Sequence, residues 1–383
     1  MPSVSLTNSP PEASPVPRVA GLDRAAWQSL CPNSGPFVHW DFLEALAETG
    51  CTGRESGWIP HPSFVSRNGE ITAAAPAWLK HHSHGEFVFD WAWARAAMQA
   101  GLPWYPKLLI AAPFTPVTGP RLLVAPNDRA SAERLVESFE RTVEGNKLSS
   151  AGVNFCTVED ASVLSDAGWL ARFDWQYHWR NEGYRDFDDF LSRFRRKARK
   201  NIRAERRKVF DAGWSFDWKD GNGLTSQEID LVTRCYLTTF RMYGNRPSLN
   251  REFYAAAARG MGPKLLVCLA RYHEEPQAAA VFWRDERRLY GRYWGSLTDT
   301  RDVHFEACYY QGIEYCLRHG LEWFEPGAQG EHKIRRGFLP CKTRSFHYIR
   351  HPGMRSAIAR YLQAEGQALN EYRQDLERLN PFA

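Results

Sequence analysis

Two polar segments in the C-terminal third of the chain carry residue types that suit acyl transfer. Segment 304–314 spaces Glu306, Tyr310 and Glu314 four residues apart, which places them on one face of a helix. Segment 325–337 combines glycines, which let the backbone pass close to a ligand, with a dense run of polar side chains. We expect the two segments to line one site.

Transfer of an acyl group to an amine needs a group that accepts a proton from the amine and a cation that holds a phosphate or an oxyanion. A carboxylate or an imidazole would accept the proton, and a lysine or arginine would supply the charge. The predicted catalytic residues are Glu306, Glu331, His332 and Lys333, and the predicted substrate-binding residues are His304, Tyr310, Glu325, Gln329, Arg336, Asp90 and Trp91. Surface salt bridges are the alternative interpretation of these side chains.

The N-terminal half carries three histidines within residues 81–84 and alternating aromatic residues over 87–91. The histidines lie in an expected hairpin loop without a distant ligand partner, so we predict no metal site and no cofactor. The aromatic alternation predicts a half-buried strand.

A strongly basic segment divides the sequence. Residues 193–208 contain ten basic residues and one acid, Glu205, a local charge of +9 in a chain of net charge +5. Apolar residues recur at helical spacing from Phe187 to Ile202, acids stand at the start and Gly213 supplies a stop signal. The pattern predicts one long amphipathic helix within 181–214 that joins the two halves.

Like charges three and four residues apart repel, so this helix favours a polyanionic partner. RNA phosphates are the expected partner, because each neutralised phosphate adds affinity and salt dependence. The predicted tRNA-binding residues are Arg196, Lys197, Arg199, Lys200, Arg203 and Arg207. A solvated linker helix and a surface for membrane lipid head groups are the alternatives.

Periodicity and turn residues predict similar elements in both halves. In the first half we expect helices over 23–30, 41–48, 93–100, 130–146 and 161–167 and strands over 64–66, 71–79, 87–91, 108–111, 121–124 and 154–157. In the second half we expect strands over 265–271, 277–283, 288–294, 323–325 and 344–349 and helices over 305–319 and 353–379. Segment 101–105 matches segment 320–324 in this scheme. Duplication of one domain explains the order, and two unrelated α/β units are the alternative.

Length and composition set the class of protein. At 383 residues, 43% of them hydrophobic, the chain fits two domains with sizeable cores. We predict a disordered tail over 1–18, a first domain over 19–180, the basic helix over 181–214, a second domain over 215–352 and a C-terminal helix over 353–383. The sequence shows no secretory signal, no apolar run of membrane-spanning length and no closely spaced cysteine pair. These features predict a soluble cytoplasmic enzyme with reduced cysteines.

Four stretches, 85–93, 105–121, 304–315 and 324–340, closely resemble the bacterial FemAB-like proteins, which are described as predicted N-acyltransferases. The similarity runs from about residue 20 to the C-terminus. A more distant likeness links Arg196-Lys197-Ala198-Arg199-Lys200 and the residues up to Glu205 to the Fem peptidyltransferases. The resemblance implies an α/β (α+β) fold of two tandem GNAT-like acyl-CoA N-acyltransferase units.

The Fem peptidyltransferases move an amino acid from aminoacyl-tRNA to an amine of a peptidoglycan precursor. Their ester donor needs only positioning and proton transfer. A GNAT pyrophosphate loop would carry glycines before its helix, whereas segment 297–303 contains none, which counts against acyl-CoA.

Three functions remain in competition. The leading hypothesis is transfer from aminoacyl-tRNA to a peptidoglycan-precursor-like or small-molecule amine. An acyl-CoA-dependent N-acetyltransferase is second, and a noncatalytic RNA-binding protein is third. The oligomeric state is not predicted.

Overall fold

The computed structural model describes the chain except for residues 1–22, 31, 33–34, 62, 299–301 and 383, so the predicted tail over 1–18 lies outside the described residues. The first half contains α1 (Arg24–Leu30), η1 (Pro36–Val38), α2 (Trp40–Glu48), β1 (Trp58–Pro60), β2 (Phe64–Arg67), β3 (Glu70–Ala74), β4 (Ala77–Lys80), α3 (Trp91–Gln99), β5 (Lys107–Ile110), β6 (Leu123–Val124), α4 (Arg129–Gly145), β7 (Ser150–Asn154), α5 (Val158–Asp166) and β8 (Leu170–Arg180). The remainder contains α6 (Phe187–Ser192), α7 (Arg196–Asp211), β9 (Trp214–Asp220), η2 (Gly221–Gly223), α8 (Ser226–Met242), α9 (Arg251–Met261), η3 (Gly262–Lys264), β10 (Leu265–Tyr272), β11 (Glu275–Arg284), β12 (Arg288–Ser296), α10 (Val303–Phe305), the π turn η4 (Glu306–Tyr310), α11 (Gln311–His319), β13 (Trp323–Glu325), η5 (Glu331–Arg336), β14 (Leu339–Ile349) and α12 (Pro352–Arg378).

One sheet runs through both halves. Its 11 strands follow the order β1-β4-β5-β7-β14-β8-β13-β12-β11-β10-β9, and β2, β3 and β6 form a separate small sheet. In the first half β4 is antiparallel to β1 and β5, and β5 is parallel to β7. In the second half β11 is antiparallel to β10 and β12, and β12 is parallel to β13. The expected α/β fold of two tandem copies is therefore confirmed.

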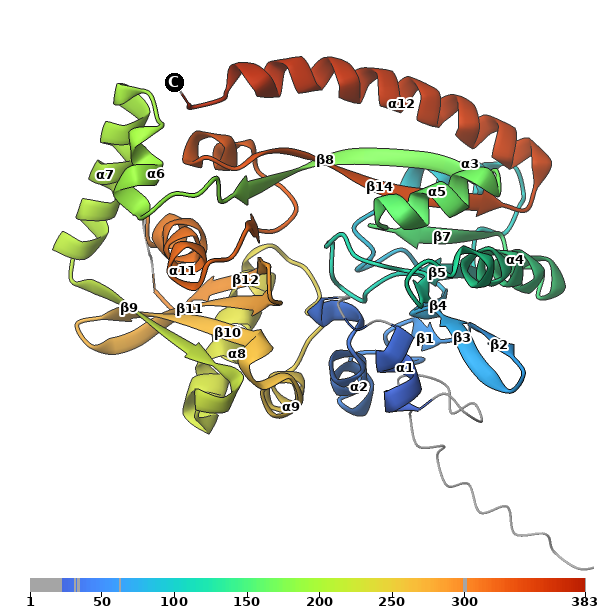
Figure 1. The fold of residues 1–383 in the computed structure, drawn as a ribbon, viewed down its shortest axis with the longest axis horizontal. Helices are drawn as coiled ribbons and strands as arrows, with labels where there is room; N and C mark the ends of the chain where they lie inside the picture. Colours follow the sequence, from blue (N-terminus) through green and yellow to red (C-terminus); the bar gives the residue numbers. More distant parts are fainter. Residues whose placement is uncertain (1–22, 31, 33–34, 62, 299–301, 383) are drawn as a thin grey trace, which may run out of the picture.

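The two copies exchange their last strands. The strand β8, which ends the first half, pairs with β13 of the second half, and β14 pairs with β7 of the first half. The long strands β8 and β14 also pair with each other, and α12 lies along them across the width of the molecule (Figure 1). The exchange ties the halves together through backbone hydrogen bonds.

The predicted match between segments 101–105 and 320–324 is wrong. The glycine at 320 follows the crossover helix α11 and leads into β13, which is parallel to β12. The glycine at 101 leads instead into β5, which is antiparallel to β4. The first-half counterpart of α11 is α4, which connects the parallel strands β5 and β7.

Several first-half strands differ from the prediction. Segment 87–91 is not a strand, because Gly85 and Phe87 have positive φ values of 78° and 60° and Trp91 opens α3. The predicted strand 71–79 is divided into β3 and β4 at Pro76, which lacks the N–H that a continuous ladder needs. The predicted strand 154–157 lies earlier, as β7, where residues 151–153 are buried.

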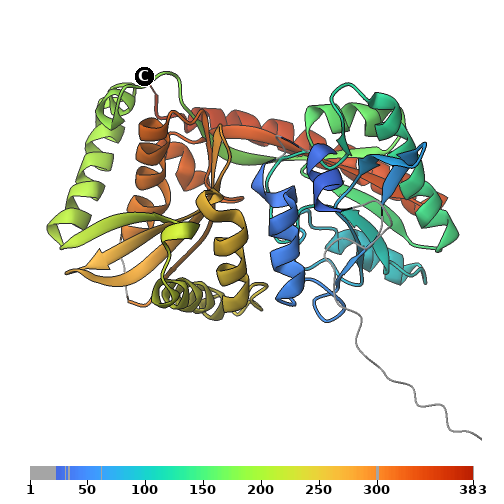
Figure 2. The same cartoon turned by 60° about the horizontal axis from the view of Figure 1, so that its bottom comes forward.

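The basic helix is shorter than predicted and does not bridge the halves. Arg195 is extended and its N–H donates to the carbonyl of Pro381, while Phe194 forms a β-bridge with Phe382. The C-terminal end of the chain thus separates α6 from α7. Figures 1 and 2 show α7 at the outer end of the second half, far from the first.

Apolar packing is shared between the halves. The side chain of Phe42 on α2 meets Trp283 on β11 and Phe253 on α9 edge to face, at centroid distances of 5.2 and 5.8 Å. Such pairs contribute about 0.5–1.5 kcal/mol each beyond their buried area.

The seven described cysteines are all free. Within the described residues, every helix is too short or too polar to cross a bilayer.

Candidate active site

Strands β12 and β13 separate close to the middle of the sheet. Their parallel pairing covers only Arg288 to Tyr290 against Trp323 to Glu325. Beyond it the chain enters the loop 326–330, in which Gly327 and Gly330 have φ values of 96° and 110° that favour glycine. The loop leads directly into η5, which carries four of the predicted site residues, Glu331, His332, Lys333 and Arg336.

Lys333 on η5 extends its side chain to this loop, where β12 and β13 separate. Its side chain is buried, with 3% of the residue exposed, and its Nζ donates to the carbonyl oxygen of Gly327 at 2.8 Å. Burial lowers the pKa of Lys333 to about 7, and the charge of Arg292 lowers it further against the opposing effect of Cys308. The side chain forms no ion pair with the described residues and is only partly charged at neutral pH, so a negative charge developing beside it would favour the ammonium form and find an unneutralised donor.

Loop 111–121 of the first half contacts strand β12 of the second half. The guanidinium of Arg292 on β12 donates to the carbonyl of Phe114 at 2.6 Å, and the hydroxyl of Tyr293 donates to the same oxygen at 3.4 Å. Arg292 also lies 6.0 Å from the ring centroid of Phe87. Both phenylalanines have positive φ, a strained conformation for bulky residues that concentrates at functional sites. Sequence reasoning missed Arg292 because a single arginine in a strand carries no motif.

Two histidines stand beside Lys333. The Nε2 of His332 lies 2.9 Å from the hydroxyl of Tyr309, and the rings of His304 and Tyr309 are 5.5 Å apart. Burial, together with His332, Lys333 and Arg336, lowers the pKa of His304 to about 4. Burial also lowers the pKa of His332, with smaller effects of Arg336 and Lys333. Both shifts favour the neutral form of the imidazole.

The predicted carboxylates are engaged elsewhere. Glu306 receives two hydrogen bonds from Arg206 of α7, at 2.9 and 3.0 Å, and one from Gln311. Glu331 is exposed and accepts a hydrogen bond from Tyr372 of α12. The structure thus places Glu306 in contacts with α7 and Glu331 in a contact with α12.

Two further predicted residues hold α7 in place. Glu205, the one acid among the basic residues, accepts from the hydroxyl of Tyr310 at 2.6 Å and from the guanidinium of Arg336 at 2.9 Å. Arg336 also lies 3.6 Å from the ring centroid of Phe305. Gln329 is exposed in the loop before η5. The predicted binding residues Tyr310 and Arg336 therefore anchor the basic helix to the site region.

Glu325 belongs to a buried polar group that the sequence did not reveal. It pairs with Arg288 at 2.8 Å, and its second oxygen lies 3.8 Å from Nε2 of His178 on β8. That oxygen has no hydrogen-bond partner among the described residues. Burial lowers the pKa of His178, and Arg288 and Lys333 lower it further against Glu325. His178 lies beside Glu325 because β8 pairs with β13 of the second half. No local sequence pattern signals this pairing.

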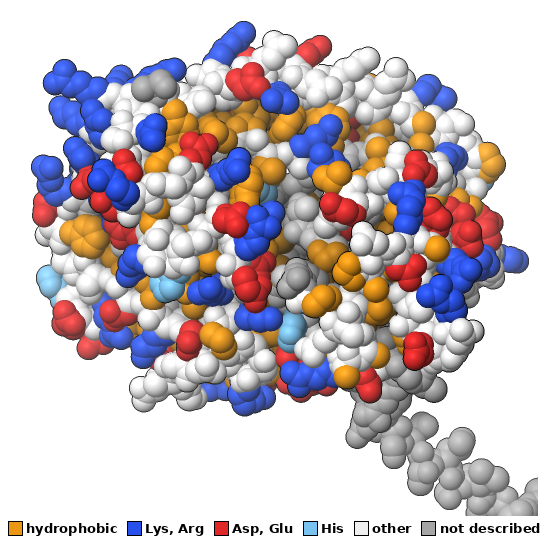
Figure 3. Space-filling model, viewed as in Figure 1, with side chains coloured by type: hydrophobic (Ala, Val, Ile, Leu, Met, Phe, Trp, Pro, Cys, Tyr) orange, Lys and Arg blue, Asp and Glu red, His pale blue; other side chains and the backbone are white. Residues whose placement is uncertain are grey.

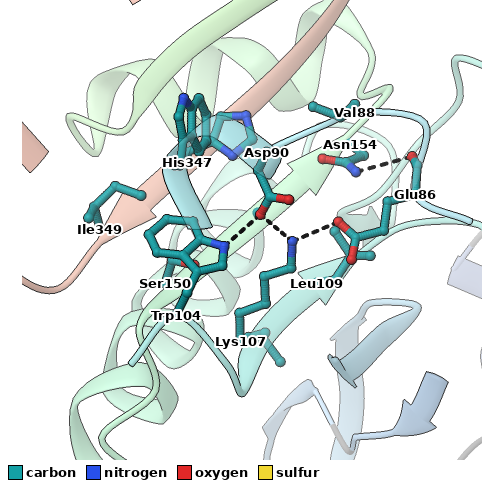
Figure 4. Close-up of a pocket in the computed structure, with 13 residues that line it drawn as sticks. Glu86, Val88, Asp90, Trp104, Lys107, Leu109, Ser150, Asn154, His347 and Ile349 are labelled. Carbon is teal, nitrogen blue, oxygen red and sulfur yellow. Dashed lines mark hydrogen bonds and ion pairs between the residues drawn. The ribbon is translucent and has the colours of Figure 1, made fainter. Parts of the chain in front are cut away.

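A second polar cluster lies in the first half (Figure 4). Nζ of Lys107 on β5 donates to Glu86 at 2.8 Å, to Asp90 at 2.5 Å and to Ser83 at 2.9 Å. The predicted residue Asp90 also accepts from the indole of Trp104 at 2.8 Å. Trp91 is partly exposed, 5.2 Å from the ring of His84, and lies outside this cluster. A lysine at the head of the apolar run Leu108-Leu109-Ile110 was the available signal for Lys107.

Lys80 holds the loop that carries Glu86. It is fully buried, its Nζ donates to the carbonyl of His84 at 3.3 Å, and it lies 3.9 Å from the ring centroid of Trp58. Burial lowers the pKa of Lys80 to about 7, opposed by Glu86 and assisted by Lys107.

This depressed pKa gives a pH-dependent stability. Between about pH 7 and the ordinary lysine value, unfolded Lys80 binds a proton that the folded state does not, so stability rises with pH. We expect wild type to gain roughly 1–2 kcal/mol relative to Lys80→Met between pH 7 and pH 8.5. Denaturant unfolding of both proteins at the two pH values measures the difference, to which Lys333 contributes equally in both. An identical pH response of the two proteins would show that Lys80 is charged when folded.

The surface of α7 is a concentrated positive patch. Of the ten basic residues in 193–208, Arg206 pairs with Glu306 and Glu314 and Arg203 pairs with Asp188. The other eight form no ion pair with the described residues; they are Arg193, Arg195, Arg196, Lys197, Arg199, Lys200, Arg207 and Lys208. Figure 3 shows this group of basic side chains at the end of the molecule where α7 lies.

Comparison with known proteins places the chain among Fem-type proteins. The FemAB-like family, described as peptidoglycan biosynthesis/recognition, matches residues 18–383. No curated protein sequence matches the chain. The solved structure of FemX aligns with a TM-score of 0.54 and 11% identity over 88% of this chain and 98% of that one.

Two further solved structures share the fold. The C-terminal domain of a putative lysylphosphatidylglycerol synthetase from Agrobacterium fabrum has a TM-score of 0.53 and 13% identity, over 91% of this chain and 96% of that one. The L-PGS of Bacillus licheniformis has a TM-score of 0.53 and 10% identity, over 92% and 99%. At these identities the likeness concerns the fold.

Proposed function

The chain belongs to the FemAB-like family, and from this premise we propose that it is an acyltransferase that moves an aminoacyl group from the ester of an aminoacyl-tRNA to an amine. The family description supports a role in peptidoglycan-related chemistry. The shared fold of FemX and the lysylphosphatidylglycerol synthetase domain supports group transfer. The acceptor would be a peptidoglycan-precursor-like or small-molecule amine, and the reaction would take place in the cytoplasm, which contains charged tRNA.

Lys333 is the observation that carries the proposal. A buried ammonium without a carboxylate partner is costly unless an anion arrives to pair with it. When an amine attacks an ester, the carbonyl oxygen becomes negative, and a donor already fixed in a dry site stabilises that charge without reorganisation. Nζ of Lys333 already donates to one carbonyl, that of Gly327. In the proposed reaction the ester carbonyl of the donor takes that hydrogen bond.

The positive surface of α7 supports tRNA as the donor. Eight cations on one short segment form no ion pair with the described part of the chain, and each would contact a phosphate and release a counterion. Arg336 binds Glu205 of α7, and its neighbour Lys333 on the same 3₁₀ turn would hold the ester. Arg336 therefore links α7, the helix that would bind tRNA, to the 3₁₀ turn that carries Lys333.

Donor choice is the experiment that tests this function. A non-hydrolysable amide analogue of aminoacyl-tRNA is expected to raise the melting temperature of the protein more than uncharged tRNA does, because the aminoacyl end adds its own contacts. Acetyl-CoA at saturating concentration serves as the comparison ligand.

Stabilisation by acetyl-CoA alone would assign the site to acyl-CoA and overturn the proposal. Equal stabilisation by charged and uncharged tRNA would show an RNA-binding protein without recognition of the acyl group.

A further inference from the structure

Arg292 is a second cation beside Lys333. Burial lowers the pKa of Lys333 to about 7, and the positive charge of Arg292 lowers it further. Neither side chain forms an ion pair with the described residues, and the carboxylate of Glu325 on the next strand pairs with Arg288. Two cations that lie close together without an acid between them favour an anion that arrives with a ligand.

Gly327 lies between Lys333 and the backbone of β12. A Cβ added to Gly327 would lie 4.0 Å from Nζ of Lys333 and 3.6 Å from the carbonyl oxygen of Gly291, the residue before Arg292. The φ of Gly327 is 96°, which favours glycine, so no side chain fills this place. A donor ester held by Lys333 would therefore lie next to the part of β12 that carries Arg292.

A β-bulge sets the direction of Arg292. Its two chain neighbours pair with Val281 and Phe282, which are adjacent on β11, so Arg292 is an extra residue on β12 without a partner there. Such a bulge bends the strand and re-aims the side chain of the extra residue. The guanidinium of Arg292 reaches the first half, where it donates to the carbonyl of Phe114 at 2.6 Å.

The guanidinium keeps donors for a ligand. It has five N–H groups, and its acceptors in the described part of the chain are the carbonyl of Phe114 and the hydroxyl of Tyr293. At least three N–H groups therefore have no acceptor among those residues. Arg292 is half-buried, and its Cζ lies 5.3 Å from the ring centroid of Tyr293 and 6.0 Å from that of Phe87. A partly desolvated arginine binds an anion more strongly than one in bulk water.

The first half fixes the carbonyl that Arg292 binds. The ring centroid of Phe114 lies 5.1 Å from that of Trp58, and a Cβ added to Gly85 would lie 2.7 Å from the ring of Phe114. Gly85, Phe87 and Phe114 all have positive φ, and such conformations persist in bulky residues only where the surrounding structure holds them. The position of Arg292 between the halves is thus set by the fold.

A carboxylate suits this place better than a phosphate monoester. It carries one negative charge and two oxygens, which match the planar donor fork of one arginine. A phosphate monoester carries about −1.5 to −2 charges at pH 7. It would compete for Lys333, whose ammonium the ester oxygen needs in the proposed reaction.

We infer that Arg292 binds a carboxylate of the acceptor, so that the preferred acceptor is an amine that also carries a carboxylate, as an amino acid or a peptide does. The inference rests on the proposed function. A carboxylate held at Arg292 places the amine of the same molecule beside the ester at Lys333. Arg292 is then a specificity-determining residue. Because its contact with the carboxylate is the same before and during transfer, it acts on KM rather than on kcat.

Acceptor pairs of matched shape test this subsite. 4-Aminobutyrate and 4-aminobutanamide differ in charge at one end, and glycine with glycinamide and 6-aminohexanoate with its amide vary the spacing. We expect wild type to favour the carboxylate of the best-fitting pair about 10- to 100-fold in kcat/KM, through a lower KM. Arg292→Gln is expected to lose the preference and Arg292→Lys to keep part of it. The comparison between proteins cancels differences in the reactivity of the amines.

Two features of the chain separate binding from structure. Arg292→Gln keeps an N–H donor for the carbonyl of Phe114 and removes the charge. Arg284→Gln is the matched control and is expected to keep the preference, because Arg284 on β11 also donates to a backbone carbonyl and a tyrosine hydroxyl. If Arg292→Gln lowers kcat for both members of each pair and keeps the wild-type ratio, Arg292 only holds the Phe114 loop and the inference is overturned.

Binding without a donor distinguishes the subsite from the proposed function. The melting temperature is measured with 4-aminobutyrate and with 4-aminobutanamide at equal concentration. A larger rise with the carboxylate that Arg292→Gln abolishes, without transfer to any amine by wild type, would reject the proposed function and leave the subsite standing. Transfer by wild type to both members of every pair with equal kcat/KM would reject the subsite and leave the function standing.

Discussion

Replacing Lys333 by Met is expected to lower kcat for aminoacyl transfer about 100- to 1000-fold, the usual effect of removing one preorganised oxyanion donor. Met keeps the length and apolar stem of the side chain and removes only the ammonium that donates to Gly327. Affinity for tRNA is expected to stay unchanged, because Lys333 is buried and α7 is not altered. Single-turnover kinetics with labelled donor measure kcat separately from binding.

The fold of Lys333→Met is expected to persist at pH 7. The buried ammonium has its pKa lowered to about 7 and lacks a carboxylate partner among the described residues, so its removal relieves a desolvation cost. Lys342→Met is the matched control, since Lys342 is an exposed lysine on β14 a few residues further along the chain. A Lys333→Met enzyme with the kcat of wild type would show that Lys333 has no role in stabilising the transition state.

The combined change of Arg199, Lys200 and Arg203 to Ala is expected to weaken tRNA binding about 10- to 100-fold near 0.1 M salt. Three lost phosphate contacts should also reduce the slope of log affinity against log salt concentration by about two to three. The structural cost is small, because Lys200 is exposed and forms no ion pair with the described residues and the pair of Arg203 with Asp188 is at the surface. Filter binding over a range of salt concentrations measures both quantities.

A matched control for α7 lies in the first half. Arg134, Arg141 and Lys147 are exposed cations on and just after α4, and their combined change to Ala removes the same charge. We expect this control to keep the salt dependence of wild type. If both triple variants lose affinity equally, binding follows net charge, and α7 is not a dedicated RNA surface.

The elements with strong local signals were predictable from the sequence. The hairpin around Asn68-Gly69, the three antiparallel strands β10, β11 and β12 and the helices α4 and α12 appear where periodicity and turn residues put them. The fold class followed from the family resemblance, because the predicted repeat relied in part on a strand over 87–91 and on a match of 101–105 with 320–324 that the structure does not show. The strand predicted over 87–91 failed, because the carboxylates of Glu86 and Asp90 turn inward to Lys107, and the positive φ of Phe87 breaks the extended chain.

Long-range features were beyond local patterns. The exchange of β8 and β14 depends on pairing between segments more than 140 residues apart in the chain, and it places His178 beside Glu325. The sequence grouped Lys333, His332 and Arg336 because they are adjacent, and η5 keeps them together. The sequence could not show that Arg206 would bind Glu306. It also could not show that Lys107 would pair with Glu86 and Asp90. Each of these signals is a single charged residue in an apolar context.

Aminoacyl transfer is tested directly by following a radiolabelled amino acid from its tRNA ester to an amine in the presence of purified protein. We expect wild type to form a base-stable amide with n-butylamine from charged tRNA and not from the corresponding acyl-CoA, and Lys333→Met to form it at least 100 times more slowly. Formation of the amide only from acyl-CoA, or from neither donor under conditions in which the protein binds charged tRNA, would contradict the proposed function.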